Sequence, residues 1–146
     1  MKISTKGDYG VRALIDLALH EGEGPTQRAE IARRQHIPES YLDHLLAQLR
    51  RDGFIRSTRG PGGGHELAKP PDEICLLHVL ECLEGSLAPL GCLEAGSSEH
   101  DAVCGQQWVW REIYDEMRDR LASVSLAELA GRERERKLAT AVTYNI

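Results

Sequence analysis

Two cysteines flank the segment of this 146-residue chain that could carry redox or metal chemistry, Cys92 and Cys104. The residues between them are rich in glycine, serine and acidic side chains and show no helical or strand period. In a reducing compartment, such cysteines bind metals or change redox state more often than they form structural disulfides. We therefore expect a sensor loop at about residues 85–107. The alternative is that both thiols are inert.

The other two cysteines, Cys75 and Cys82, lie on an apolar segment, residues 74–83, whose leucines recur at helical spacing. Their separation of seven residues places both on one face of the predicted helix. Because a buried cysteine behaves as a small hydrophobic residue, we expect both to lie in the core.

A long helix is predicted directly after the loop, at about residues 108–124. Its apolar residues recur at spacings of four and three, as in the seam of a coiled coil: Trp110, Tyr114, Met117, Leu121 and Val124. We expect this seam to form a homodimer interface, although it could instead pack within the monomer. A capping-box pattern at Ser125 to Glu128 predicts a further short helix, and residues 132–137 are expected to fray.

Upstream of this part, the sequence predicts three helices. The first covers residues 8–21, and the second is short, capped by Thr26 and finished by His36. The third begins near Glu39, after a proline, and stops at Gly53. It presents a leucine stripe to the core: Leu42, Leu45, Leu46 and Leu49.

A β-hairpin is expected next, with strands at residues 54–59 and 65–68 and a glycine-rich turn between them. Helices joined by a tight turn and followed by a hairpin form the winged helix-turn-helix arrangement. The expected fold is therefore mainly α with a small β-hairpin wing. A winged helix-turn-helix DNA-binding domain would occupy residues 1–70. Residues 71–146 would hold the sensor loop, the long dimerisation helix and a C-terminal tail.

This arrangement predicts binding to a double-stranded DNA operator, because a helix fits the major groove and a wing lies against the backbone or minor groove. The DNA-binding residues are expected on the exposed helix faces and on the wing: Thr26, Arg28, Ser40, Tyr41, Asp43, His44, Arg50, Arg56, Arg59, Gly62 and Gly63. A carboxylate accepts from the cytosine amino group but repels phosphate. Asp43 therefore fits sequence specificity better than affinity.

The net charge of −5 hides an uneven distribution of charged residues along the chain. Residues 1–70 carry 11 basic and 9 acidic residues, whereas residues 71–146 carry 7 and 14. The basic surplus therefore lies in the predicted DNA-binding half, as expected for a nucleic-acid-binding part joined to another function.

Composition excludes other classes of protein. No apolar run approaches the roughly 20 residues that span a bilayer. The first residues also lack the apolar core of a signal peptide, so we expect a cytoplasmic protein without a membrane partner. We expect no enzyme, because no nucleophile with its base is visible. The glycine run at residues 60–64 also lacks the Lys-Ser/Thr of a phosphate loop.

Four segments carry a resemblance to a known family: residues 4–14, Tyr41-Leu42, the Arg-Gly-Pro-Gly-Gly-Gly run at 59–64, and residues 126–129. The first of them reads Ser-Thr-Lys-Gly-Asp-Tyr-Gly-Val-Arg-Ala-Leu. Together, over about residues 1–130, they resemble the bacterial winged-helix transcriptional regulators that include IscR, NsrR and CymR. The resemblance implies a dimeric transcription factor in which a long helix of each subunit crosses to its partner.

In the iron–sulfur members of that family, three cysteines before the dimerisation helix bind a [2Fe–2S] cluster. Cys92 and Cys104 match the first and third of them, and Ser98 lies near the middle position. Members similar to IscR add a histidine three residues after the last cysteine, where this chain has Gln107. The family's possible ligands are therefore present in a non-standard combination.

Two further residues enter the ligand set that the resemblance implies. Members similar to NsrR use an aspartate from the first helix of the other subunit, and Asp8 matches that position. His100 is the fourth candidate, by its proximity in sequence to the cysteines. The expected function is a homodimeric DNA-binding regulator whose operator binding depends on a [2Fe–2S] cluster or on the redox state of Cys92 and Cys104. The alternative is a regulator without a cluster that uses a disulfide switch or another effector.

Overall fold

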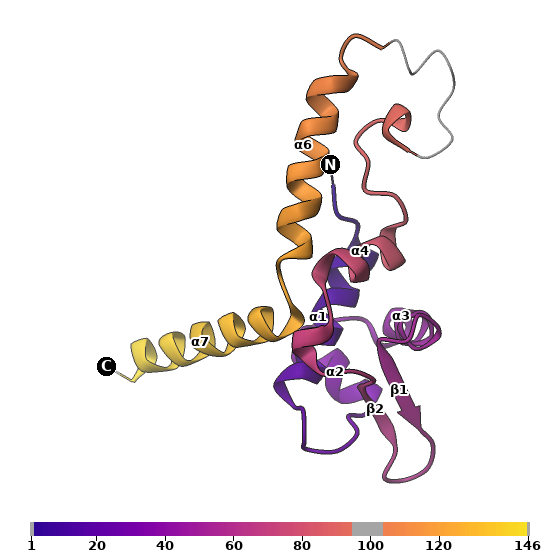
Figure 1. Cartoon of the computed structure of the whole chain (residues 1–146). Coiled ribbons are helices and arrows are strands. Elements are labelled where there is room, and N and C mark those ends of the chain that lie inside the picture. The colour runs from indigo at the N-terminus through magenta and orange to yellow at the C-terminus, as the bar shows by residue number, and fades with distance from the viewer. Residues whose placement is uncertain (1, 95–103, 146) are drawn as a thin grey trace.

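The computed structural model describes residues 2–94 and 104–145 of the chain. Its first half contains three helices and an antiparallel hairpin (Figure 1): α1 Thr5–Leu19, α2 Arg28–Gln35, α3 Glu39–Arg51, β1 Ile55–Thr58 and β2 Gly64–Leu67. The second half is helical: η1 Pro71–Glu73, α4 Leu76–Glu84, η2 Gly91–Leu93, α6 Gln107–Ala122 and α7 Leu126–Tyr144. The predicted fold, mainly α with a small hairpin wing, is therefore confirmed.

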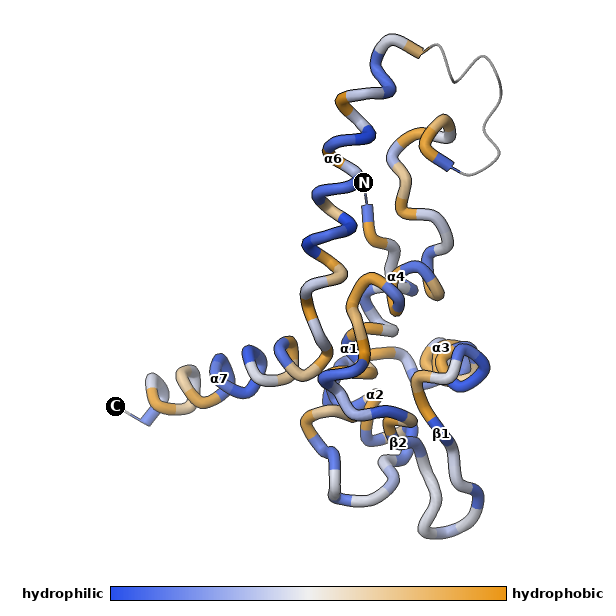
Figure 2. The backbone as a smooth tube through the Cα atoms, in the orientation of Figure 1, coloured by the Kyte–Doolittle hydropathy of each residue, from blue (hydrophilic) through white to orange (hydrophobic). Residues whose placement is uncertain are grey.

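The main core lies where α1 packs against α2, α3, α4 and the start of α7. The predicted stripe of α3 is confirmed, since its four leucines are at most 2% exposed: Leu42, Leu45, Leu46 and Leu49. Burying one such side chain stabilises the folded state by about 1.5–3 kcal/mol. By contrast, α6 and α7 alternate between hydrophilic and hydrophobic residues along their length (Figure 2).

A second, smaller core joins α4 to α6 and to the segment that contains η2. Leu77 and Leu80 of α4 pack there against Cys92 and Tyr114. Val79 and Leu83 lie in the main core. α4 is thus shared by both cores.

The start of α1 lies very close to the end of α4. Ser4 caps α1 by accepting from the Gly7 amide, so the helix begins earlier than the predicted Asp8. The Ser4 amide and hydroxyl both donate to Glu84 Oε1, at 2.9 and 2.7 Å. A Cβ on Gly10 would lie 2.3 Å from Leu83 Cδ1. Glycine is therefore what allows the two helices to approach this closely.

The prediction that Thr26 caps α2 is wrong. Gln27 is the N-cap residue and its side chain makes no capping hydrogen bond. Thr26 is extended instead, because its backbone pairs with His65: the Thr26 amide donates to the His65 carbonyl at 2.9 Å, and the His65 amide donates back at 2.8 Å. These two bonds attach the wing to the residue that precedes the helix-turn-helix.

The prediction that Cys75 and Cys82 both lie in the core is also wrong. Cys82 is exposed and Cys75 is half-buried. α4 begins only after Cys75, and its buried residues are Leu77, Val79, Leu80 and Leu83. A separation of seven residues places the cysteines on one face, but the spacing alone does not say which face is buried.

The C-terminal helix is longer than the sequence predicts. α7 continues without a break through residues 132–137 and projects from the body of the molecule (Figure 1). The charges expected to fray it form pairs one turn apart instead. Arg132 lies 3.0 Å from Glu128, and Lys137 lies 2.8 Å from Glu133. Such pairs stabilise an exposed helix slightly. No helix in residues 2–94 and 104–145 combines the length and apolar character required to cross a membrane.

Replacing Gly10 with alanine should destabilise the protein. The new methyl group would force the buried Leu83 to move, and such overpacking costs about 1–3 kcal/mol. Urea unfolding followed by circular dichroism measures this loss. Gly131→Ala is the control, because nothing lies within 4 Å of its added Cβ. That variant should gain about 0.4–1 kcal/mol, and an equal loss in both would contradict the close approach of α1 and α4.

Candidate nucleic-acid interface and cysteine loop

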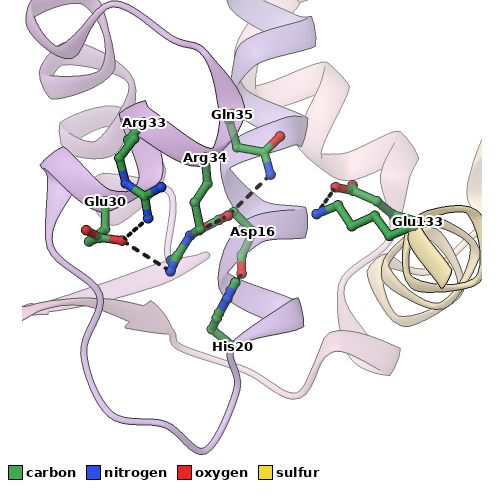
Figure 3. A network of polar contacts seen from close by, with 8 residues as sticks. Asp16, His20, Glu30, Arg33, Arg34, Gln35 and Glu133 are labelled. Atoms are coloured by element: carbon green, nitrogen blue, oxygen red, sulfur yellow. Dashed lines mark hydrogen bonds and ion pairs between the residues drawn. The ribbon is translucent and has the colours of Figure 1, made fainter. Parts of the chain in front are cut away.

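A buried carboxylate on α1 fixes the position of α2. Asp16 is fully buried and accepts from Arg34 Nε at 3.1 Å and Nη2 at 2.8 Å (Figure 3). Gln35 Nε2 donates to the same carboxylate at 3.2 Å. Arg12, one turn earlier on α1, donates to the Gln35 carbonyl. A buried charge needs such partners, so α2 has one favoured position on α1.

The sequence reasoning did not single out Asp16. The available signal was a carboxylate between Ile15 and Leu17 in an otherwise apolar stretch. Such a residue is buried only when it is paired, which predicts a cationic partner on a neighbouring element.

The first turns of α3 present polar side chains to solvent. Ser40, Asp43 and His44 are exposed, and Tyr41 is 37% exposed. The ring of Tyr41 meets the Tyr9 ring edge-on, with centroids 5.7 Å apart. This contact anchors the start of α3 to α1, and it leaves the other side chains free to meet a ligand.

Arg28, the first residue of α2, is bound to α3. Its Nη1 lies 2.6 Å from Asp43 Oδ1, and its Nε lies 3.2 Å from Glu39 Oε1. The hydrogen bond to Asp43, followed by that to Glu39, raises the pKa of the guanidinium above its ordinary value. Two predicted DNA-binding residues, Arg28 and Asp43, are therefore paired with each other.

The wing presents arginines around a tight glycine turn. Arg59 and Gly62 are exposed at its tip, and Arg56 lies 3.5 Å from Glu66 on the opposite strand. A Cβ on Gly63 would lie 2.1 Å from the Thr58 carbonyl oxygen, so this turn excludes any side chain there. Gly63, a predicted DNA-binding residue, is therefore buried against its own hairpin, whereas Gly62 is exposed.

His65 lies within β2, opposite Ser57 of β1. Its Nδ1 lies 2.8 Å from the Ser57 hydroxyl. Burial, and then the positive charges of Arg50 and Arg28, lower the pKa of this imidazole below its ordinary value. Arg50 is exposed at the end of α3. The charges of α2 and α3 therefore act on a wing residue.

The cysteine loop is closed at its ends by one side chain. Gln107, at the start of α6, donates from Nε2 to the Cys92 carbonyl at 3.1 Å. Cys92 is 7% exposed in the second core, and Cys104 is half-buried. His100 lies outside the described residues. No group of three possible metal ligands occurs within residues 2–94 and 104–145.

Asp8, the ligand candidate on α1, lies away from this loop in sequence and has a partner on its own helix. Its side chain is 57% exposed, and its Oδ2 lies 3.4 Å from Arg12 Nη1. It borders an open depression of about 530 Å³ whose apolar floor includes Val11, Leu76 and Leu80. The Asp8 carboxylate is therefore accessible to solvent beside this depression.

The predicted seam of α6 packs largely within the chain. Tyr114 is buried in the second core, and Trp110, Met117 and Leu121 are half-buried against it. Val124 lies beyond α6, where its carbonyl accepts from the Leu76 amide at 3.0 Å. Ile113 and Trp108 are exposed on α6, at 48% and 65%. The helix therefore retains apolar surface after its own core is complete.

Comparison with known proteins adds independent findings. Residues 3–132 match the profile of the Rrf2 family, described as iron-dependent transcriptional regulators. The HTH-type transcriptional regulator IscR of Pectobacterium atrosepticum is 38% identical over 129 residues, which cover 88% of this chain and 79% of the relative. CymR, the global cysteine regulator of B. subtilis, is similar in structure, with a TM-score of 0.77 and 37% sequence identity. The match covers 90% of this chain and 98% of CymR. IscR of T. potens is also similar in structure, with a TM-score of 0.74 and 38% sequence identity. The match covers 93% of this chain and 90% of that protein.

Replacing Asp16 with asparagine should weaken the fold at the junction of α1 and α2. The change removes the buried charge that Arg34 needs, at a cost of roughly 2–4 kcal/mol. Thermal or urea unfolding measures the loss. Glu30→Gln is the matched control, because Glu30 is an exposed partner of the same arginine, at 3.6 Å. Glu30→Gln should lower the free energy of unfolding by less than about 1 kcal/mol. Equal losses in the two variants would contradict the role assigned to Asp16.

Proposed function

Because the chain belongs to the Rrf2 family of transcriptional regulators, we propose that it acts as a homodimer that binds a DNA operator. We further propose that the loop containing Cys92 and Cys104 controls this binding. The observation that carries the proposal is the exposed polar start of α3 together with the exposed wing, beside an α2 that Asp16 holds on α1. Such a face has the shape and polarity of a winged helix that enters DNA.

The residues of this face divide by the part of DNA that they would contact. The exposed start of α3, with Ser40, Asp43 and His44, would face base edges in the major groove. Arg50 and Arg59 would neutralise phosphates on either side. Thr26 holds the wing in position through its backbone bonds to β2.

A second copy of the chain is the proposed partner, because a palindromic operator requires two recognition helices. The support is the apolar surface that α6 retains, with Trp108 and Ile113 exposed. Ile113 lies one turn from Trp110 and one turn from Met117 on the same side of α6, and both of these residues are only partly buried. We propose α6 as the dimer contact.

The loop can influence α3 because α4 connects them. Cys92 and Leu80 of α4 belong to the same buried cluster, the second core. At the end of α4, the Cys82 carbonyl accepts from Gln48 Nε2 of α3 at 2.8 Å, and Glu84 accepts from Ser4. A shift of the loop therefore changes the support of both the recognition helix and α1, which is the physical basis for control.

One chain supplies two cysteine ligands, half of the four ligands that a [2Fe–2S] cluster needs. Cys92 and Cys104 fit, since thiolates are the usual ligands and both cysteines border the loop. Asp8 of the partner subunit and His100 are the proposed remaining ligands. A bound cluster would supply a charge that changes with oxidation state. In this chain, the second core would bury the Cys92 side chain, and Gln107 would hold the Cys92 carbonyl by a hydrogen bond.

A disulfide switch is the second candidate, favoured by the presence of two thiols and the absence of a third cysteine in this loop. Two thiols would become one disulfide, with loss of two protons and transfer of two electrons to an oxidant such as a peroxide. Cys92 would have to leave its buried position for this reaction. Oxidation would thereby loosen the second core and the support that it gives to α4.

Replacing Arg59 with alanine should weaken DNA binding by about tenfold or more, since a charged hydrogen bond to phosphate is lost. The probe is a duplex selected by the wild-type protein from a randomised pool, and fluorescence anisotropy gives the affinity. The slope of log Kobs against log salt should fall by about 1.8, because the dimer loses two phosphate contacts. Arg134→Ala on the exposed part of α7 removes the same charge away from the wing and from α6, and it should change neither value. Equal effects of both variants would contradict wing contact.

Anaerobic purification with iron and sulfide assays separates the two sensing chemistries. A cluster predicts a coloured protein with roughly two irons per subunit, lost in Cys92→Ser. A colourless protein that loses about 2 Da on peroxide treatment supports the disulfide, provided that Cys92→Ser abolishes the loss and Cys82→Ser keeps it. A protein that shows neither change would contradict sensing at this loop.

A further inference from the structure

We infer that Arg28 is a positioning residue: it orients Asp43 toward base amino groups instead of contacting a phosphate. The inference rests on the proposed DNA binding and assigns part of its specificity. Arg28 opens α2, and both of its acceptors are on α3. It therefore acts across the turn of the helix-turn-helix.

The Arg28 guanidinium binds one carboxylate through each of two nitrogens. Nη1 lies 2.6 Å from Asp43 Oδ1 and Nε lies 3.2 Å from Glu39 Oε1. These carboxylates are four residues apart, so they stand one turn apart on the same face of α3. The rigid, planar donors of arginine suit such a double contact, which a flexible point charge would not fix.

The charge of this group disfavours phosphate. Arg28 carries one positive charge against the two negative charges of Glu39 and Asp43, so the start of α3 is acidic. Arg50, Arg51 and Arg59 have no ion pair among the described residues, and they lie at the end of α3 and on the wing. Phosphate contact therefore fits those arginines, and base contact fits the start of the helix.

The Asp43 oxygen that Arg28 leaves unbonded, Oδ2, determines which base group Asp43 would recognise. Its side chain is 63% exposed, and Oδ2 accepts no hydrogen bond from the residues that the structure describes. Holding Oδ1 on Arg28 restricts the rotation of the carboxylate and leaves Oδ2 as an acceptor. In the major groove the complementary donors are the amino groups of cytosine and adenine, and a carboxylate suits cytosine N4 best.

The experiment uses full-length protein and duplexes selected by the wild type from a randomised pool. Each amino-bearing base pair of the selected half-site is then exchanged in turn, and affinities are measured for wild type and Arg28→Gln. Wild type should lose about 5- to 100-fold at one cytosine position or more. Arg28→Gln should reduce that discrimination to about threefold or less, with the salt slope unchanged within about 0.3.

Two further variants make the outcome decisive. Asp43→Asn should lose the same discrimination, and adding Arg28→Gln to it should have no further effect, because both act through one carboxylate. Arg59→Ala is the control and should lower the salt slope while keeping the discrimination. Since the Arg28 pairs are exposed, its variant should melt within about 2 °C of wild type, which separates positioning from unfolding.

Three results would overturn the inference. The first is that Arg28→Gln keeps full discrimination. The second is that the salt slope falls by about 1.8, which marks a phosphate contact of Arg28 in each subunit. The third is that wild type binds strongly without preference for any cytosine or adenine position. If wild type binds no duplex in a salt-dependent manner, the proposed function itself fails, and the assignment of Arg28 fails with it.

Discussion

The buried ion pair of Asp16 with Arg34 is the constraint on which the DNA-binding face depends. A carboxylate this deeply buried is stable only while its partners stay in place, so α2 cannot slide or rotate on α1. α2 in turn carries Arg28, which holds the first turn of α3. The preceding Thr26 holds the wing through its backbone. The Asp16 charge therefore fixes α2, while the main core and the contacts made by Arg28 and Thr26 position α3 and the wing beside it.

α4 gives this face a connection to the rest of the chain. One side of the helix belongs to the main core through Val79 and Leu83, and the other belongs to the second core through Leu77 and Leu80. Packed interiors transmit displacement because they contain little free space. In the proposed function, a chemical change at Cys92 would act on α3 through the second core and α4.

The sequence predicts the elements of the DNA-binding half well, because apolar spacing and glycine turns are local signals. The leucine stripe of α3 and the wing follow directly from them. Long-range pairs are different. The backbone pairing of Thr26 with His65 and the side-chain bond of Gln48 to α4 depend on which elements meet in space. Likewise, spacing places Cys82 on a helix face but does not say whether that face is covered.

The resemblance of the cysteine loop to its family indicates where sensing would occur. A cluster there would need ligands besides Cys92 and Cys104, whereas a disulfide would need only these two. The DNA-binding face, in contrast, is formed by α2, α3 and the wing of one chain. Binding of DNA by two such faces is therefore the central claim, and chemical footprinting on the selected duplex tests it most directly. Two protected major-groove segments, separated by about 34–36 Å along the helix axis, are predicted. A single protected segment, or uniform protection without a preferred position, would contradict the account.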